Sequence, residues 1–459
     1  MQRVVLTFGG LLCFLATIAA ADDGRIRPDD EHPRYWRYQG QPVLLLGGSV
    51  EDNLFQIPHL EEHLDLLRDC GGNYVRNTMS SRDQGNVWPF EKTADGRYDL
   101  SLPGEEYWRR CENLLRLAQE RDIVVQIELW DRFDFAREPW ELNPYNPANN
   151  VNYTVEQSGL ETHYPEHPGG NQNPFFRAVP ELENNGVVFD YQRAQVDRLL
   201  AISLDYPNVL YCMDNETSGR PEWGAHWATY IRRTAAERGV QVQTTEMWDP
   251  WDLGDAMHDH TFDHPETYSF IDVSQNNHQR GQDHWDNMQR QRERISENPR
   301  PMNNVKIYGA DGGRYGGSRD GAERFWRNVL GGMASARFHR PDSGLGLMDE
   351  AQTHLRSARM LTDAIVWQDC QPRIDLLAER DDNEAYLLAA PGREYALYFP
   401  DGGAVELDLS DTAGTFELRW LEIEQSRWNE GRAVAGGGRV PLEAPGRGHW
   451  AAAILRREE

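Results

Sequence analysis

The stretch NVLYCMDNETSG, from Asn208 to Gly219, carries a strong fold signal and a candidate functional group side by side. Its first half, Val209 to Met213, is apolar, as expected of a buried strand. Its second half, Asp214 to Thr217, gathers two acids and an amide. Either this is an ordinary boundary between a strand and a loop, or Glu216 is a catalytic acid at the end of a barrel strand.

Strand and helix patterns alternate on both sides of this stretch. A helical pattern precedes it at 188–207, and another follows it at 222–239. Along the chain about eight strands recur in this way, most of them separated by helices. Alternation of this kind is typical of a parallel sheet. The pattern predicts an α/β fold, a (β/α)₈ TIM barrel over residues 22–372.

The pattern changes after Pro372. Short alternating strands such as EAYLLAAP, EYALYFP and TFELRWLEI follow one another, with turns such as Asp401-Gly402-Gly403 between them. The sequence therefore predicts a small all-β sandwich over residues 373–459.

One segment inside the barrel region departs from the alternation. Residues 131–185 are rich in Pro, Asn, Gly and aromatic side chains, including Trp140, Tyr145 and Phe175. A loop of this length is usually either functional or disordered. Its aromatic content favours an ordered, functional loop.

The first 21 residues have the pattern of a signal peptide. Arg3 supplies the positive charge, 4–18 are apolar, and Ala19-Ala20-Ala21 form a small-residue cleavage site. This apolar part is too short for a membrane span, and no other stretch is apolar enough to cross a membrane. Cys13 lies in a poor lipoprotein context. We expect a secreted or periplasmic chain without a membrane span.

Composition narrows the class of partner. The 459 residues carry a formal net charge of −27, so nucleic acid is an improbable partner. Lys92 and Lys306 are the only lysines, and every other cation of the 47 is Arg. A salty habitat and a GC-rich genome both give this bias. The 15 Trp suit stacking on sugar rings as well as core packing.

Cysteine spacing gives no metal signal. Cys70 and Cys111 each fall in a helical pattern and could pair in an exported protein, whereas Cys212 is expected to be a free core thiol. Without a CxxC motif, a structural zinc site is not expected. Asp249, Asp252 and Asp255 could form a calcium loop, although an acidic loop surface explains them equally simply.

Polar residues close almost every predicted strand. In a barrel these positions meet at the carboxyl-terminal mouth, where active sites lie. One or two polar caps would be ordinary, but acids or amides at nearly all strand ends indicate a functional site. The residues are Glu51-Asp52-Asn53, Arg76-Asn77, Glu128 with Trp130-Asp131, Asn215-Glu216, Glu246 with Trp248-Asp249, 275–278, Asp311, and Arg337 with His339.

Facing carboxylates are what hydrolysis of a glycosidic bond needs. One carboxyl must be protonated to protonate the leaving oxygen, and the other must be ionised to attack the sugar or activate water. Arg76 could keep the second group ionised, and Asn215 could bind a sugar hydroxyl beside the bond to be cut.

These motifs resemble the clan-A glycoside hydrolases, and within them the apiosidase-like group. YQGQPVLLLGGS resembles their opening strand, GGNYVRN their second strand with its Arg, and YPNVLYCMDNE their fourth strand with its Asn-Glu pair. The C-terminal sandwich resembles the small domain that follows their barrels. The resemblance covers nearly the whole mature chain and implies a TIM barrel that hydrolyses glycosides.

Carried over to this sequence, Glu216 matches the acid/base, Asn215 its hydroxyl-binding neighbour and Arg76 the second-strand Arg. The seventh strand departs from the pattern. KIYGADGG lies where the family has a strand ending in Glu, and Asp311 takes the Glu position. Because Asp is one methylene shorter, the stereochemical outcome stays open. Glu246 is the second candidate for the missing carboxylate.

Other residues at the strand ends have alternative explanations. His278 and His339 are expected to be hydrogen-bonding pocket residues, because no metal-ligand spacing surrounds them. Asp131 is expected to line the site. Trp130, Trp248 and Trp251 are either platforms for sugar rings or ordinary core residues.

We expect a secreted O-glycosidase in which Glu216 is the proton donor and Asp311 the nucleophile of a retaining mechanism without a cofactor. Its expected substrates are polysaccharides or their fragments. One alternative is a carbohydrate-binding protein on a barrel that has lost its nucleophile. Another is a polysaccharide lyase that uses Tyr or His, for which Arg76, Arg337 and Arg340 would have to form a local basic patch.

Overall fold

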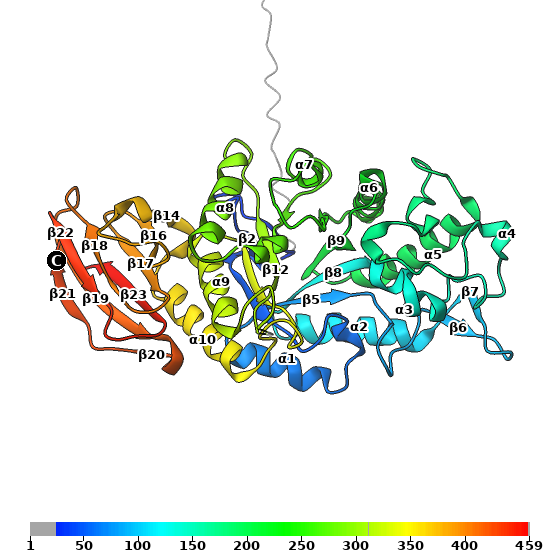
Figure 1. Cartoon of the computed structure of the whole chain (residues 1–459), viewed down its shortest axis with the longest axis horizontal. Helices are drawn as coiled ribbons and strands as arrows, with labels where there is room; N and C mark the ends of the chain where they lie inside the picture. The colour runs from blue at the N-terminus through cyan, green and yellow to red at the C-terminus, as the bar shows by residue number, and fades with distance from the viewer. Residues whose placement is uncertain (1–23, 311, 458–459) are drawn as a thin grey trace, which may run out of the picture.

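Eight strands form a single parallel sheet that curls into a nearly closed barrel (Figure 1). The computed structural model describes residues 24–310 and 312–457. Neighbours along the sheet follow the order β10-β9-β8-β5-β4-β13-β12-β11. The predicted (β/α)₈ barrel is therefore confirmed. Its strands are β4 (Leu45–Gly48), β5 (Tyr74–Thr78), β8 (Val124–Asp131), β9 (Val209–Asn215), β10 (Gln243–Thr245), β11 (Ile271–Asp272), β12 (Met302–Ile307) and β13 (Ser335–Phe338).

A helix follows each barrel strand and packs on the outside of the sheet. In α1 and α2, leucine and other apolar residues on one face are buried, while the other face is charged. The helices are α1 (Leu60–Asp69), α2 (Glu105–Gln119), α5 (Gly186–Ser203), α6 (Pro221–Glu237), α7 (Ala256–Phe262), α8 (Gly281–Arg294), α9 (Ser318–Leu330) and α10 (Asp349–Asp363).

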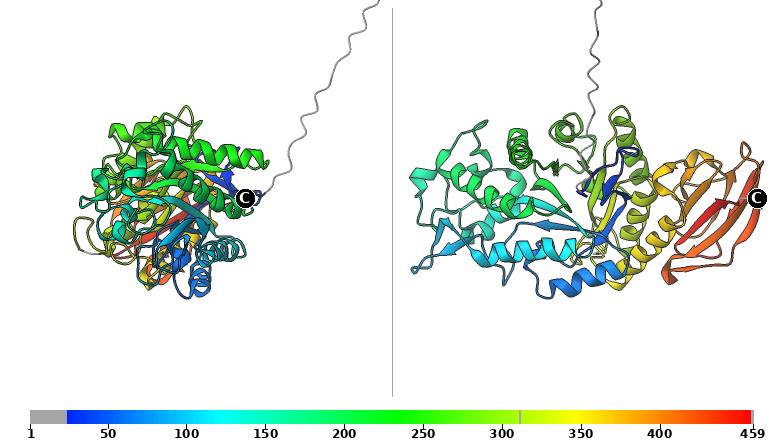
Figure 2. Two further views of the ribbon diagram at one scale, coloured as in Figure 1. Left: turned by 90° about the vertical axis from the view of Figure 1, so that its right-hand side faces the viewer. Right: turned by 180° about the vertical axis from the view of Figure 1, so that it is seen from behind.

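The amino-terminal end of the barrel is closed by a three-stranded antiparallel sheet of β1 (Arg27–Pro28), β2 (Trp36–Tyr38) and β3 (Gln41–Val43). The Trp36 ring is fully buried and its Nε1 donates to Oδ1 of Asn303 inside the barrel at 2.9 Å. Seen from behind, these strands lie on the side turned toward the viewer (right view of Figure 2). The other end of the barrel is thus the open mouth.

The segment after β8 is ordered. It contains two short α-helices and three 3-10 helices, which are labelled η. In chain order they are η2 (Arg132–Phe135), α3 (Arg137–Leu142), α4 (Val155–Ser158), η3 (Pro168–Gly170) and η4 (Pro174–Arg177). Phe135, Trp140 and Phe175 pack together, with the Phe135 and Phe175 ring centroids 4.2 Å apart. A β-hairpin, β6 (Phe90–Lys92) and β7 (Tyr98–Pro103), lies beside it. The expectation of an ordered loop is confirmed.

The C-terminal domain consists of two antiparallel sheets around their own core, as predicted. It packs on α8, α9 and α10: the Trp326 ring stacks on Tyr398 at 5.3 Å, and Ser357 donates to the carbonyl of Ile423. This domain also contains three short 3-10 helices, η6 (Trp367–Asp369), η7 (Ile374–Leu376) and η8 (Ile423–Gln425). The strands are β14 (Gln371–Pro372), β15 (Leu377–Ala378), β16 (Tyr386–Ala390), β17 (Glu394–Phe399), β18 (Ala404–Asp408), β19 (Thr415–Glu422), β20 (Arg427–Trp428), β21 (Arg432–Ala435), β22 (Arg439–Glu443) and β23 (Trp450–Arg456).

The seventh barrel strand is shorter than the sequence predicts. β12 ends at Ile307, whereas the pattern extended it to Asp311. The chain turns at Gly309, whose φ of +119° is open to glycine alone, and a Cβ there would meet the Gly321 nitrogen of α9 at 2.6 Å. Asp311 therefore follows the turn instead of closing the strand, and it lies outside the described residues.

The possible disulfide between Cys70 and Cys111 is not formed. Both thiols are free and buried, and the Cys70 thiol contacts the carbonyl of Leu67 at the end of α1 instead. Cys212 is a free thiol inside the barrel, as expected. The predicted signal peptide lies outside the described residues, and among those that are described no helix could span a membrane.

Close packing of β4 on β5 depends on Gly47. A Cβ at this position would lie 1.8 Å from the backbone oxygen of Tyr74, which cannot move without separating the strands. We predict that Gly47→Ala lowers the free energy of unfolding by about 3 kcal/mol or more, measured by chemical denaturation. Gly186→Ala is the control, because a Cβ there meets nothing within 4 Å. Equal effects of the two substitutions would contradict this account.

Candidate active site

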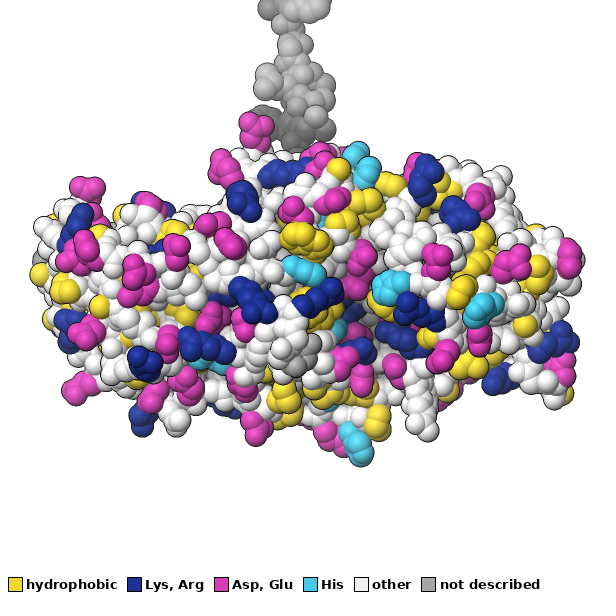
Figure 3. All heavy atoms as spheres, in the orientation of Figure 1, with side chains coloured by type: hydrophobic (Ala, Val, Ile, Leu, Met, Phe, Trp, Pro, Cys, Tyr) yellow, Lys and Arg dark blue, Asp and Glu magenta, His cyan; other side chains and the backbone are white. Residues whose placement is uncertain are grey.

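Polar side chains from most of the barrel strands meet at the mouth. The sequence-predicted residues Arg76, Asn215, Glu216 and His339 are brought together there with Gln275 and His278 of η5 (Ser274–His278). In the orientation of Figure 3, hydrophobic, basic, acidic and His side chains surround a hollow near the centre of this face.

Glu216 lies at the centre and comes directly after β9. Its backbone has a φ of +52°, in the left-handed region that a non-glycine residue rarely adopts. A conformation of this kind costs of order 1–3 kcal/mol and is found mainly at functional sites. It directs the side chain inward, where Nε2 of Gln275 donates to the carboxylate at 3.2 Å. The Glu216 side chain is 16% exposed.

The main partner of Glu216 is Lys306, which the sequence analysis did not select. The Lys306 ammonium on β12 forms an ion pair with the Glu216 carboxylate and donates to Oδ1 of Asn215 at 2.9 Å. Its third neighbour is the sulfur of Met247 at 3.5 Å. Lys306 is 2% exposed, so this is a buried pair. The available sequence signal was a lone lysine within an apolar strand of a chain whose cations are nearly all Arg.

The ion pair decides the protonation state of Glu216. Burial alone would raise the pKa of its carboxyl, but the charge and hydrogen bond of Lys306, helped by Arg76 and Gln275, outweigh burial and lower the pKa. Glu216 is therefore a carboxylate at neutral pH. A proton donor needs the opposite state, so this environment suits a nucleophile or a base better than the donor role expected from sequence.

Arg76 has different partners from those expected. Its guanidinium is fully buried between Asp52 and Glu128, with Nε 2.6 Å from Oε1 of Glu128. Burial opposes ionisation of Asp52, but the charge of Arg76, with those of Arg340 and Arg337, takes the pKa of Asp52 well below its usual range. Burial lowers the pKa of His339, which lies 3.6 Å from Asp52, so this imidazole is neutral.

The Asn215 side chain is fixed from both ends. Its oxygen accepts from Lys306, and its Nδ2 donates to Oδ1 of Asp131 at 3.0 Å. The other oxygen of Asp131 binds Arg82, which also contacts Asp134. These contacts orient Asn215 and Asp131 at the mouth, where the sequence placed them.

Glu246 faces away from this centre. Its Oε1 accepts from the backbone nitrogens of Asp214 and Met247, and its Oε2 approaches Gly224 of α6 so closely that a Cβ there would lie 2.1 Å away. Burial and the neighbouring Asp214 carboxyl raise its pKa well above the usual value. Since the carboxyl is directed at a helix outside the sheet, we do not assign Glu246 as the second catalytic carboxylate.

Two of the tryptophans considered as sugar platforms are core residues. Trp130 is 2% exposed and packs against Phe175, Trp223 and Trp227, so its proposed role as a substrate platform is wrong. Trp248 is equally buried and donates to Thr261. Neither ring has a free face for a sugar.

An aromatic row does line the mouth. Trp251 is 54% exposed, and its ring lies 5.8 Å from that of His278. The row continues through Tyr315 and Tyr308, whose rings stack at 4.4 Å, and ends at His339. The charge of Glu216 acts on the pKa values of both His278 and Tyr308, which shows that the row passes the central carboxylate.

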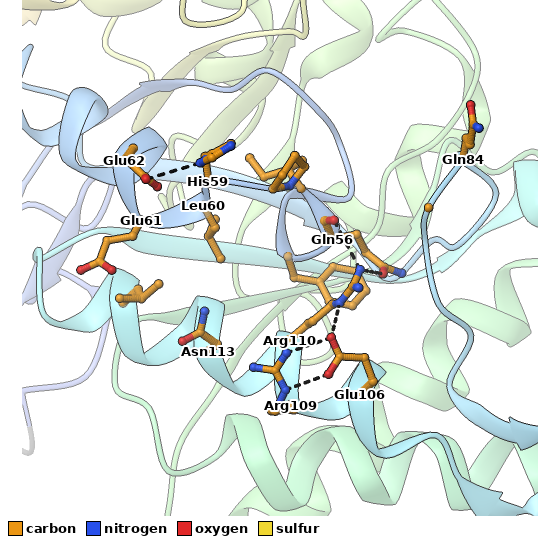
Figure 4. A pocket seen from close by; sticks show the side chains of 15 residues that line it. Gln56, His59, Leu60, Glu61, Glu62, Gln84, Glu106, Arg109, Arg110 and Asn113 are labelled. Atoms are coloured by element: carbon orange, nitrogen blue, oxygen red, sulfur yellow. Dashed lines mark hydrogen bonds and ion pairs between the residues drawn. The ribbon is translucent and has the colours of Figure 1, made fainter.

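A groove of about 730 Å³ lies elsewhere, between α2 and the segment from η1 (Leu54–Gln56) to α1 (Figure 4). Its charged side chains bind one another: Arg109 and Arg110 both pair with Glu106, and Arg110 also reaches Gln56. These contacts leave few polar groups of the groove without a partner. Within the part of the chain that the structure describes, no cluster of His, Cys, Asp and Glu is arranged to hold a metal ion.

Comparison with known proteins supports the fold. No family model and no curated protein matches the sequence. A solved structure described as a glycoside hydrolase is similar over 95% of this chain and 98% of its own, with a TM-score of 0.64 and 11% identity. A glycoside hydrolase family 5 protein from Bacteroides vulgatus is similar over 94% and 93%, with a TM-score of 0.62 and 13% identity. A family 5 mannosidase from Rhizomucor miehei covers 74% of this chain and 98% of its own, with a TM-score of 0.51 and 10% identity.

At these identities the similarity concerns the fold. The first two structures match along nearly the whole chain, barrel and C-terminal domain together. The expected resemblance to clan-A glycoside hydrolases is thus confirmed as a resemblance of architecture. The apiosidase-like subgroup stays a prediction.

The Lys306–Glu216 pair generates a thermodynamic prediction. Lys306→Met leaves Glu216 buried without its counter-charge, and breaking one side of a buried pair costs about 3–5 kcal/mol of the free energy of unfolding at neutral pH. The double variant Lys306→Met/Glu216→Gln should recover most of this loss, because the glutamine needs no counter-charge. Chemical denaturation of both variants and the wild type measures the effect.

The pH dependence follows from the sign of the pKa shift. Without Lys306, burial holds the folded pKa of Glu216 above its unfolded value of about 4.3, so the single variant is penalised while Glu216 is ionised. The penalty should shrink as the pH falls from neutral to about 5, where Glu216 takes up a proton. In the wild type the folded pKa is lowered, so the stability due to this pair persists over the same range. A penalty independent of pH would contradict the assignment.

Proposed function

We propose that this protein is an exported glycoside hydrolase that cleaves O-glycosidic bonds at the mouth of its barrel. The observation that carries the proposal is Glu216: an inward-facing carboxylate in a strained left-handed conformation at the end of the fourth barrel strand. Its neighbour Asn215 is held beside it, and an aromatic row passes it. The architecture shared with glycoside hydrolases supports the same reaction class.

The mechanism requires a carboxylate and a carboxylic acid on opposite sides of the scissile bond. Glu216 supplies one of them, and its ionised state fits attack on the anomeric carbon or activation of water. Asp311 stays the sequence-based prediction for a partner at the seventh strand. The signal peptide supports secretion or export to the periplasm, where polymeric sugars are accessible.

The mouth suits a neutral saccharide. Trp251 offers an exposed ring face to a sugar, and His278 and Tyr315 continue the same surface. The buried cations Arg76 and Lys306 are already paired with carboxylates, so neither is free to receive an anionic sugar. Since two structures of similar fold are a mannosidase and an endo-1,4-beta-mannanase, mannans are the first substrates to examine.

A carbohydrate-binding protein without hydrolytic activity is the second candidate. The observation that favours it is Lys306, a cation on the strand where related barrels carry their second carboxylate. Such a protein would retain oligosaccharides without releasing reducing ends. This difference separates the two candidates in one assay.

Substitution of Glu216 tests the proposal. On β-mannans, xylans, β-glucans and arabinans, followed by release of reducing ends, we predict activity of the mature wild-type chain on one class. Glu216→Gln should lower this activity at least about a hundredfold. Glu222→Gln is the matched control, because Glu222 pairs with Arg220 on the surface of α6. Binding without hydrolysis by the wild type would favour the second candidate.

Trp251 should act on binding more than on the chemical step. Removing the ring in Trp251→Ala should raise KM about tenfold, equivalent to about 1.4 kcal/mol, and change kcat little. Trp251→Phe should retain most of the affinity, because it keeps an aromatic face. A fall in kcat without a change in KM would place Trp251 in a different role.

A further inference from the structure

The carboxyl of Asp249 lies near Glu216 at the mouth, on the segment that follows the neighbouring strand β10. Trp248 and Thr217 pair as a parallel bridge, and the Asp249 nitrogen donates to the carbonyl of Thr217 at 2.8 Å. Asp249 is therefore held against the residue that follows Glu216. The alternation of side chains along this segment places it on the inner face, since Met247 contacts Lys306 while Trp248 points out to Thr261.

The Asp249 carboxyl is partly enclosed and unbound. A Cβ on Gly169 would lie 3.3 Å from its Oδ2, so the loop after β8 covers it from one side. Among the described residues, no hydrogen bond or ion pair reaches this carboxyl. The other acids at the centre differ, because Asp52, Glu128 and Glu216 each bind a cation. A half-buried carboxyl without a protein partner is available to a ligand.

Glu216 and Asp249 both act on Tyr315. Burial raises the pKa of its phenol, Arg314 lowers it, and the charges of the two carboxyl groups raise it. Tyr315 belongs to the aromatic row, next to His278 and Tyr308. A sugar bound along this row would thus come close to both carboxyl groups.

The pKa values of the two carboxyl groups are also shifted in opposite directions. Burial, followed by the charge of Glu216, raises the pKa of Asp249, and the charges of Lys306, His167 and Arg132 only partly oppose this. Glu216, in direct contact with Lys306, has a lowered pKa. A pair with separated pKa values is the usual basis for assigning an acid and a base in one site.

We propose that Asp249 is the proton donor of this site and that Glu216 is its nucleophile, with Lys306 as the residue that positions Glu216 and keeps it ionised. This proposal rests on the proposed hydrolase function. It assigns the second carboxylate to the segment after the fifth barrel strand, so that the seventh strand does not have to supply one.

The reaction balances in two steps. In the first, a Glu216 oxygen forms a bond to the anomeric carbon, the bond to the glycosidic oxygen breaks with its electron pair, and Asp249 transfers its proton to that oxygen. In the second, Asp249 takes a proton from water as the water oxygen attacks the anomeric carbon. The ester to Glu216 then breaks, which restores the Glu216 carboxylate and the Asp249 acid.

Leaving-group dependence tests the role of Asp249. The probes are the oligosaccharide cleaved fastest in the polysaccharide panel and the dinitrophenyl glycoside of the same sugar. Asp249→Asn should lower kcat/KM about 100- to 10,000-fold on the oligosaccharide. On the dinitrophenyl glycoside it should lower kcat/KM less than about tenfold, because that leaving group needs no proton. Asp252→Asn, an exposed acid of the same loop, is the control.

Azide rescue tests the assignment of the two roles independently. With the dinitrophenyl glycoside, azide should accelerate Asp249→Ala and yield a glycosyl azide with the anomeric configuration of the substrate, since azide attacks the ester to Glu216. With Glu216→Ala it should yield the opposite anomer, because azide then attacks the substrate directly. Unchanged near-ultraviolet circular dichroism shows that each variant is folded.

Three results distinguish the possible failures. Equal losses on both probes, or the retained anomer from Glu216→Ala, would overturn the assignment of Asp249. Loss of all hydrolysis in Asp311→Asn, with Asp249→Asn unaffected, would return the second role to the seventh strand. No hydrolysis by the wild-type chain would instead refute the underlying hydrolase function.

Discussion

The buried contact between Lys306 and Glu216 organises the mouth of this barrel. Removing two charges from water is costly, so such a pair persists only when further hydrogen bonds satisfy both partners. Here Asn215 accepts from the ammonium, and Gln275 donates to the carboxylate. Asn215 is in turn oriented by Asp131. The position of each of these side chains thus depends on the ion pair at their centre.

The same rule of paired burial extends outward from this contact. Arg76 is enclosed between Asp52 and Glu128, and Arg82 joins Asp131 to Asp134. Below these pairs, Leu210, Cys212 and Val305 pack with Trp36 and Tyr38 of β2. The ion pairs therefore lie in one layer at the carboxyl ends of the strands. That layer is where a parallel barrel binds its ligands.

Local pattern predicted the fold and part of the site. The apolar run from Val209 to Met213 predicted a buried strand, and the acids after it were therefore expected at the end of that strand.

The local sequence pattern did not predict the features that depend on contacts between residues distant in sequence. Alternation from Asn303 and Val305 would turn Lys306 outward, but β12 shifts its register between Asn304 and Ile307, which brings Lys306 inside. The end of the same strand is set by the approach of Gly321 on α9 to Gly309. The aromatic shell around Trp130 comes from α6 and from the loop after β8.

The use of arginine for nearly all cations has a practical consequence for coupling chemistry. Besides its amino terminus, the chain presents amines only at Lys92 and Lys306. Lys306 is enclosed within the barrel, whereas Lys92 is exposed on β6. That hairpin lies at the end of the molecule opposite the β-sandwich (Figure 1). Among the side chains, amine-directed immobilisation or labelling would therefore modify one exposed position, at the hairpin end of the molecule.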